Sequence, residues 1–494
     1  MLLPLSVFSV NLLSENLLLL ASILVFMAIL VTKVGSKLGA PSLLLFLLLG
    51  MVAGADGLGL HFEDYELAES IGHFAMTIIL FAAGFETSLE ETKPVFKKGV
   101  MLSTLGVALM ILLTGLFIWW IGGKVHGYRL MACFLLAAVM SSTDSASVFS
   151  VLREKKLRLK ENLGPLLELE SGSNDPVAYM LTISLVGFFL EGGGEAHGSW
   201  AFVLSGGLLL LLQIVVGLAV GFAMGYATKW VLQRIHFSGA LTSILILSIG
   251  FFTNGIASVL HGNGLLACYL TAIIIGNKVK LPEKKVVANF FDGFTWLMQL
   301  VMFLMLGLLA RPSHMLPVLL PSLLIGLFMM LVARPASVFI SLLPFRHVSF
   351  RAKALISWVG LKGAGPILFA LCPIVAGLQN ASQMFNIVFL ITLFSLLFQG
   401  GTLGKVAGLL KMTDTEPKKA ETFGMDVPEE MGQMLDHVVT EEDLVRGATL
   451  RAIHLPHGIR VMMVRRNGKF LVPHGSMELF PGDHLIIIMG ESDD

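Results

Sequence analysis

The stretch LGPLLELESGSNDPVAYMLTISLVGFFL, residues 163–190, is mainly apolar but carries three acidic residues, Glu168, Glu170 and Asp175. A helix of about 20 mainly apolar residues crosses the hydrocarbon layer of a membrane. Ionisable side chains at that depth are costly, and they usually mark a functional site. The stretch therefore predicts a membrane-spanning helix that carries a polar site.

The composition of the whole chain also indicates a membrane protein. Its 494 residues have a mean hydropathy of +0.82, and 14% of them are charged, whereas a soluble domain has about 25% charged residues. Basic and acidic residues are equal in number, which gives no indication of a nucleic-acid partner. Cys133, Cys268 and Cys372 lie far apart in apolar stretches, so we expect neither disulfides nor a cysteine metal site, and no cofactor.

Thirteen segments of the chain are long and apolar enough to be predicted as spans. They lie near residues 17–36, 40–56, 68–86, 99–122, 129–150, 163–190, 199–228, 238–257, 262–277, 289–310, 315–341, 353–376 and 383–408. Lysine and arginine gather in the odd-numbered loops, whereas the even-numbered loops contain only Lys124, Arg129 and Arg311. Because basic loops stay in the cytoplasm, we expect the N-terminus outside a bacterial inner membrane and everything after residue 409 inside. The N-terminal residues have no basic leader or cleavage site, so we expect them to be retained.

The chain is predicted to contain a membrane domain at 1–411, a polar linker at 412–434 and a small cytosolic domain at 435–494. In the last part, Asn467-Gly468 stands between two strand-like runs, which is a strong signal for a β-hairpin. The predicted fold class is therefore an all-α polytopic membrane protein followed by a small α/β domain.

The first polar site in the membrane is Ser141-Ser142-Thr143-Asp144-Ser145, inside the fifth predicted span. Small polar side chains compete for backbone hydrogen bonds and disfavour a continuous helix. An unwound segment at this depth exposes carbonyls that can hold a cation. The alternative is a Ser/Thr face that packs against a neighbouring helix, with Asp144 merely hydrogen-bonded.

The second site is in the sixth span, where Ser171, Asn174 and Asp175 stand at i, i+3 and i+4 and share one helix face. Glu170 points away from Asp175 and can serve a separate partner. Since a single carboxylate can hold either a proton or a cation, Asp175 supplies the minimum requirement for exchange. The alternative is a buried polar cluster that only fixes helix packing.

The third site is Gly360-Leu361-Lys362-Gly363-Ala364-Gly365-Pro366, in the twelfth span. Its glycines and proline predict a second broken helix, and paired broken helices indicate a transporter binding site built from inverted repeats. Lys362 needs a carboxylate partner, for which Glu170 is the first choice. The alternative is that Lys362 reaches the membrane surface.

These motifs together resemble the sodium/proton exchanger and NhaP-like branch of the cation–proton antiporter superfamily. The resemblance covers residues 17–408 and rests on Phe81–Glu86, Thr143-Asp144, Glu170-Ser171 with Asn174-Asp175, and Trp358–Ala364. Two positions depart from the family pattern. Lys362 stands where the family usually has arginine, and Ser145 stands where many relatives have proline.

The resemblance implies roles for the site residues. Asp175 would carry the cation and the proton, while Ser171, the Thr143 carbonyl and Glu86 would help to coordinate the cation. Asp144 and Asn174 would organise the crossing of the broken helices, Glu170 would pair with Lys362, and Arg334 would have a structural role. The resemblance also implies a homodimer.

The tail, Gly447–Met489, resembles the TrkA-C domain, which is typically regulatory and occurs on potassium transport systems. The resemblance implies a small regulatory ligand for this domain. No Gly-rich nucleotide-binding motif precedes it, so we do not expect a dinucleotide sensor.

The combined prediction is a secondary antiporter, not an enzyme, that exchanges a monovalent cation for protons in cation, pH or cell-volume homeostasis. Potassium is favoured and sodium is second. One exchanging carboxylate favours electroneutral exchange. The alternatives are a gated cation channel, for which no TVGYG-like filter is present, and a transport-inactive sensor that signals through its tail.

Overall fold

The structure is a computed structural model of the chain. It describes residues 17–38, 41–123, 129–154, 157–190, 200–235, 239–279, 281 and 284–415, and, in the C-terminal part, 434–439, 443–444, 448–452, 459–466 and 469–489. The chain divides into two compact units, Met1–Thr415 and Glu416–Asp494. Each unit is described by itself.

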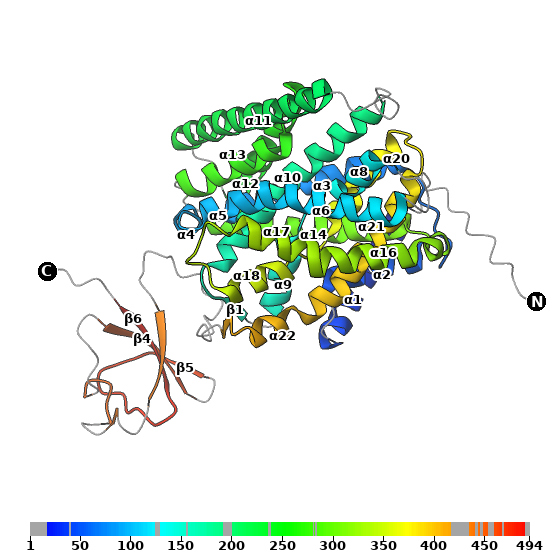
Figure 1. Cartoon of the computed structure of the whole chain (residues 1–494). Helices are drawn as coiled ribbons and strands as arrows, with labels where there is room; N and C mark the ends of the chain where they lie inside the picture. The colour runs from blue at the N-terminus through cyan, green and yellow to red at the C-terminus, as the bar shows by residue number, and fades with distance from the viewer. Residues whose placement is uncertain are drawn as a thin grey trace, which may run out of the picture. The chain divides into compact units, whose positions relative to one another are not determined.

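Each of the thirteen predicted spans is helical in the first unit (Figure 1). Within the described ranges, seven helices or helix runs are long and apolar enough to cross a membrane, and five shorter apolar helices accompany them. Eight spans are single helices: α1 (Leu17–Leu38), α2 (Ser42–Ala53), α3 (Tyr65–Glu86), α10 (Leu163–Leu190), α11 (Trp200–Arg234), α12 (Gly239–Val259), α13 (Gly264–Lys278) and α14 (Lys284–Leu309).

Three further spans are helix runs that contain short π- or 3₁₀-helical stretches. The first consists of α5 (Phe96–Met101), η2 (Leu102–Gly106), α6 (Val107–Ile118) and η3 (Trp119–Gly123), and follows the one-turn helix α4 (Leu89–Thr92). The second consists of α15 (Pro312–Met315), η4 (Leu316–Val318), α16 (Leu319–Phe328), η5 (Met329–Ala333) and α17 (Arg334–Ser341). The third consists of α21 (Ala381–Phe394), η6 (Ser395–Gly400) and α22 (Gly401–Leu409).

The remaining two spans are broken, as predicted. The fifth span consists of α8 (Leu130–Val139) and α9 (Ser145–Glu154), and the twelfth of α18 (Phe350–Trp358), α19 (Ala364–Phe369) and α20 (Leu371–Val375). The two unwound segments meet, since the Asp144 amide donates to the Leu361 carbonyl at 2.9 Å. Small polar residues in one segment and glycines in the other leave the backbone free to make this contact.

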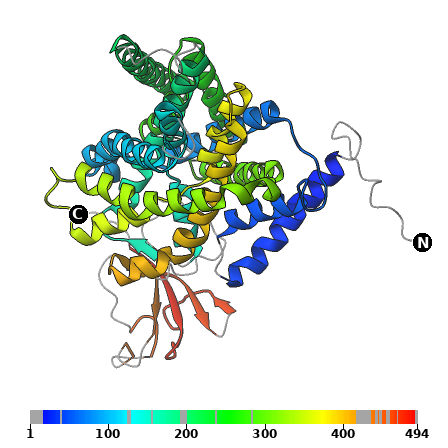
Figure 2. The ribbon, with the colours of Figure 1, turned by 45° about the vertical axis from the view of Figure 1, so that its right-hand side comes forward.

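The helices pack closely where small residues face each other. In both views α11 lies beside α13 and α1 beside α2 (Figure 2). Where α2 crosses α14, a Cβ on Gly50 would lie 2.3 Å from the Leu304 carbonyl oxygen and 2.8 Å from Gly307 Cα. The two backbones therefore touch, an approach that small residues permit between membrane helices.

A short two-stranded sheet joins two distant parts of the first unit. Strand β1 (Leu157–Leu159) lies between α9 and α10, and strand β2 (Thr413–Thr415) follows α22. The strands pair antiparallel, with Arg158 opposite Asp414. Residues 413–415 belong to the predicted linker, most of which lies outside the described residues.

The second unit contains a four-stranded antiparallel sheet in the order β3-β6-β4-β5. Its strands are β3 (Met434–Val438), β4 (Ile459–Arg466), β5 (Lys469–Leu471) and β6 (His484–Met489). Arg466 pairs with Lys469, as the predicted hairpin requires, although its turn residues Asn467-Gly468 lie outside the described residues. Val464, Leu485 and Ile487 are buried in the core of this unit.

Asp483 anchors the turn before β6. It receives two hydrogen bonds from the Arg466 guanidinium, at 2.9 and 2.7 Å, and one from the Phe480 amide at 2.9 Å. The Arg466 side chain holds the pKa of Asp483 below its usual value. The ionised form is therefore the one that this fold favours.

We predict that Asp483→Asn destabilises the C-terminal sheet by about 2 kcal/mol, as expected for lost hydrogen bonds to a charged group. Because the pKa of Asp483 is lowered in the folded state, its contribution is present above its unfolded pKa of about 3.9 and is lost as the pH falls through the folded pKa. Hydrogen exchange of peptides from β4 and β6 in the full chain measures the effect. Glu478→Gln, the matching change at an exposed side chain, serves as the control, and equal exchange in the two variants would contradict the prediction.

Candidate functional site

The candidate site lies where the two unwound segments meet α10. Ser142 and Thr143, from the fifth span, face α10 from one side. Gly363, from the twelfth span, lies so close to Asp144 that an added Cβ would be 2.0 Å from its carboxylate oxygen. The backbone at this crossing therefore requires glycine at position 363.

Asp175 is held by the unwound segment of the fifth span. The Ser142 hydroxyl donates a hydrogen bond to the Asp175 carboxylate. The motif Ser141–Ser145 predicted no separate role for Ser142, although its place in a run of five small polar residues was the available signal. Ser142 therefore joins the group of candidate site residues.

A second row of contacts lies on the same side of α10. The Asn174 amide nitrogen donates to the Thr143 hydroxyl at 2.6 Å, and this hydroxyl lies 3.4 Å from that of Ser171. The Asn174 side-chain oxygen is buried and accepts no hydrogen bond from the described residues. An acceptor in this position has the chemistry of a cation ligand.

Asp144 closes the start of α9. Its carboxylate accepts hydrogen bonds from the Ser147 amide, at 3.2 Å, and from the Ser147 hydroxyl. A carboxylate in this position caps the helix and interacts favourably with the helix dipole. Asp144 thus stabilises the point at which the unwound segment returns to helix.

Glu170 forms a buried ion pair with Arg334 of α17, and not with Lys362 as predicted. The Arg334 Nη1 to Glu170 Oε1 distance is 2.6 Å, and the two side chains are 6% and 1% exposed. A buried carboxylate requires a nearby cation, and the fold supplies a permanently charged guanidinium. Gly360 makes room for it, since an added Cβ there would lie 2.7 Å from Arg334 Nε.

Lys362 lies inside the site and does not reach the membrane surface. Its side chain is buried, and its ammonium donates to the Ser142 carbonyl at 2.9 Å, while its backbone amide donates to the Ser395 hydroxyl at 2.9 Å. Ser142 therefore contacts both residues: its carbonyl accepts from Lys362, and its hydroxyl donates to Asp175.

Glu86 is a further sequence-predicted site residue, and it comes from α3 and not from α10 or the two broken spans. It is the last residue of α3, and its side chain is exposed. The hydrogen bonds described for Asp175, Asn174 and Thr143 join them to Ser142, to Ser171 and to one another.

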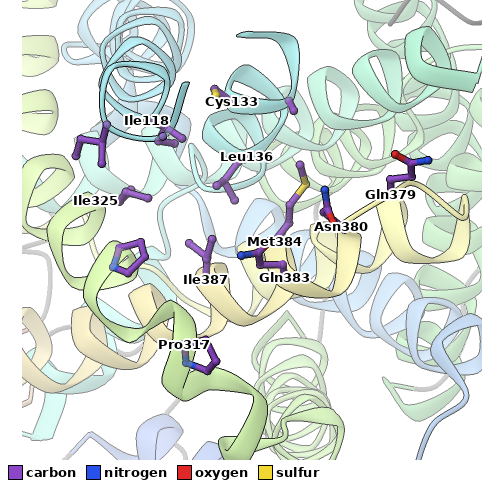
Figure 3. A pocket seen from close by; sticks show the side chains of 14 residues that line it. Ile118, Cys133, Leu136, Pro317, Ile325, Gln379, Asn380, Gln383, Met384 and Ile387 are labelled. Atoms are coloured by element: carbon purple, nitrogen blue, oxygen red, sulfur yellow. The ribbon is translucent and has the colours of Figure 1, made fainter. Parts of the chain in front are cut away.

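An apolar cavity of about 310 Å³ lies elsewhere in the first unit, between α6, α8, α16 and α21 (Figure 3). Cys133, Leu136 and Ile387 line it, and Gln379 and Gln383 are among its polar residues. None of the residues that line it is charged, and none belongs to the group around Asp175. The cavity is therefore not the candidate cation site.

Two family models match the chain. The model described as sodium/hydrogen exchanger, transmembrane, matches residues 22–407. The TrkA-C domain model matches residues 434–493.

Several curated relatives match most or nearly all of the chain. The K(+)/H(+) antiporter NhaP2 of Shewanella oneidensis is 35% identical over 480 residues, which cover 95% of this chain and 80% of that protein. The K(+)/H(+) antiporter NhaP of Alkalimonas amylolytica is 34% identical, with 96% and 81% covered. The low-affinity Na(+)/H(+) antiporter NhaS1 of Synechocystis is 25% identical, with 74% and 70% covered.

The fold is similar to that of a solved structure, the sodium proton antiporter MjNhaP1 of Methanocaldococcus jannaschii. The TM-score is 0.66 at 21% sequence identity, and the match covers 79% of this chain and 97% of that one. At this level of identity the likeness shows the fold alone.

The ion pair yields a test that separates the two candidate partners of Glu170. Arg334→Ala should lower the free energy of unfolding by about 3–5 kcal/mol, because it leaves Glu170 buried without its cation. Combining Glu170→Gln with Arg334→Met should recover much of the loss, since both charges are then removed. Thermal unfolding of the purified protein is the measurement.

The control double variant combines Glu170→Gln with Lys362→Met and should show no such recovery. If it recovers stability while the Arg334 double variant does not, Lys362 is the partner of Glu170 and the assignment above is wrong.

Proposed function

The chain belongs to the sodium/hydrogen exchanger family of membrane cation–proton antiporters, and on this basis we propose that it exchanges potassium for protons. Potassium is supported by the two relatives that are 34–35% identical and are named as K(+)/H(+) antiporters. Sodium is the second candidate, because a relative at 25% identity is named as a Na(+)/H(+) antiporter.

The observation that carries the proposal is the placement of Asp175. Its carboxylate is held by the Ser142 hydroxyl at the crossing of the unwound segments. A carboxylate there can bind a proton in one step and a cation in the next, but it cannot hold both charges. Competition for this one group couples the two fluxes.

The oxygens around Asp175 suit a monovalent cation. The Ser171 hydroxyl and the Asn174 side-chain oxygen, which has no hydrogen-bond partner among the described residues, lie on α10, and the Thr143 hydroxyl lies on the unwound segment beside them. Unwound backbone supplies carbonyls for cation coordination in transporters. We assign Asp175, Thr143, Ser171 and Asn174 to cation and proton binding, Ser142 to positioning of Asp175, and Asp144 to the crossing.

The charge inventory favours electroneutral exchange. Glu170 and Arg334 neutralise each other, and Lys362 and Asp144 contribute opposite charges nearby. When Asp175 is protonated, these charges sum to zero, and the same holds when Asp175 is ionised and binds one cation. Exchange of one cation for one proton thus leaves the charge of the buried site unchanged.

Membrane placement and assembly follow from the loop charges and the family. We propose an inner-membrane protein whose N-terminus is outside and whose C-terminal domain is cytoplasmic, because the basic loops are then inside. A homodimer is proposed from the family resemblance. The C-terminal unit matches the TrkA-C domain, and we propose that it regulates exchange in response to a small ligand.

The carrier assignment predicts that Asp175→Asn abolishes exchange without preventing insertion, because asparagine cannot bind and release a proton. Proton movement in membrane vesicles, started by adding potassium or sodium, is the measurement. Asp292→Asn, the same change at an exposed position of α14, should exchange as the wild type does.

Clear residual exchange in folded Asp175→Asn protein would contradict the assignment. The same assay tests the alternatives. A channel passes the cation without counter-movement of protons, and a transport-inactive sensor moves neither ion.

The regulatory role predicts that removal of residues 416–494 leaves a folded exchanger with an altered pH or ligand dependence. A ligand can change transport only if it binds two states of the protein with different affinity. Exchange is measured against pH for the full chain and the deletion, and thermal unfolding verifies that the shortened chain is folded. Superimposable profiles, with and without cytosolic nucleotides and salts, would show that the tail has no regulatory effect.

A further inference from the structure

The loop between α9 and α10 contains strand β1. This strand pairs with β2, which lies at the end of the membrane unit. β1 lies between α9, which Asp144 caps, and α10, which carries Asp175. β2 follows α22 and ends at Thr415, the last residue before the C-terminal unit. Along the chain, β1 is therefore flanked by the two helices of the site, and β2 is followed directly by the C-terminal unit.

The pairing is made by backbone hydrogen bonds that extend beyond the two strands. The Lys160 amide donates to the Met412 carbonyl at 3.0 Å. Because hydrogen-bonded pairs alternate along an antiparallel ladder, Arg158 and Asp414, two register positions away, form a hydrogen-bonded pair. The Asp414 amide is thus a donor in this sheet.

Strand β1 and the residue directly before β2 are also packed against the membrane unit. Leu157 and Leu159 pack against its main hydrophobic core, to which the buried Met412 belongs. A displacement of β2 therefore acts on packed elements and is not absorbed by a free loop.

The link from β1 to α10 is short and conformationally restricted. Glu161 and Asn162 have φ values of 56° and 54°, a region that costs non-glycine residues free energy and persists only where surrounding contacts enforce it. The Leu163 amide donates to the Lys160 carbonyl at 3.1 Å, and α10 begins at that residue. From there to Asp175 the helix runs about 18 Å, at about 1.5 Å per residue.

We propose that the C-terminal unit regulates exchange by changing the β1–β2 pairing, and that the loop between α9 and α10 transmits this change to the Ser142–Asp175 contact. The inference rests on the regulatory role proposed above. The loop adjoins both α9 and α10. A displacement of this loop therefore moves the Asp175 carboxylate on α10 relative to Ser142, which lies just before α9.

The test compares two substitutions at Asp414 in the full chain. Asp414→Pro removes the amide donor and disrupts the pair, whereas Asp414→Ala removes the same side chain and retains the donor. The pH for half-maximal exchange should move in Asp414→Pro by at least half of the shift caused by deleting residues 416–494. Asp414→Ala should give the wild-type profile.

A deletion that shifts the profile while Asp414→Pro leaves it unchanged overturns the inference but not the regulatory role. A deletion without any effect overturns both. Equal shifts in Asp414→Pro and Asp414→Ala would also count against the inference, because the strand bond would then not be the cause.

If Asp414→Pro does not fold, a disulfide between β1 and β2 tests the inference instead. Arg158→Cys combined with Asp414→Cys places two thiols at paired positions, at a spacing that a disulfide can bridge. The three native cysteines are buried. In the oxidised protein, deletion of residues 416–494 should no longer shift the profile, and reduction should restore the shift. A full shift in the oxidised protein would place the regulatory contact elsewhere.

Discussion

The buried charges of the membrane unit must neutralise one another, because ionised groups removed from water are stable only when they are paired. Glu170 and Arg334 meet this constraint directly through their ion pair. With these two charges compensated, Asp175 is the carboxylate whose charge, we propose, changes during exchange. The ion pair thus separates a fixed part of the site from a variable part.

Ser142 connects the variable part with the broken helices. Its carbonyl accepts from Lys362 of the twelfth span, and its hydroxyl donates to Asp175 of α10. A continuous helix would bond this carbonyl internally, so the break in the fifth span is what makes it available. The unwound backbone therefore serves the site directly.

The same loop region links the site to the rest of the chain. The residues between α9 and α10 include β1, which pairs with the strand after the last membrane helix. Only a few backbone hydrogen bonds hold this pair, and it is the element through which we propose that the C-terminal unit acts.

Much of the fold was predictable because its signals are local. Hydrophobic length identified the thirteen spans, and small polar residues or glycines identified the two breaks. The face shared by Ser171, Asn174 and Asp175 follows from the helical repeat. The role of Ser142 was less accessible, since its run contains three serines that local rules do not distinguish.

The sequence by itself predicted which residues form the spans and where the helices break, and it singled out Asp175 as the carboxylate that we propose exchanges a proton for a cation. These properties depend on solvation and on the helical repeat, which act over one or two turns. Only the tertiary structure decided that Glu170 pairs with Arg334, that Lys362 contacts Ser142, and that β1 pairs with β2. Ser142 and Lys362 are 220 residues apart, and hydropathy and periodicity carry no information about which distant segments pack together. Contacts of this kind depend on the packing of all the helices at once.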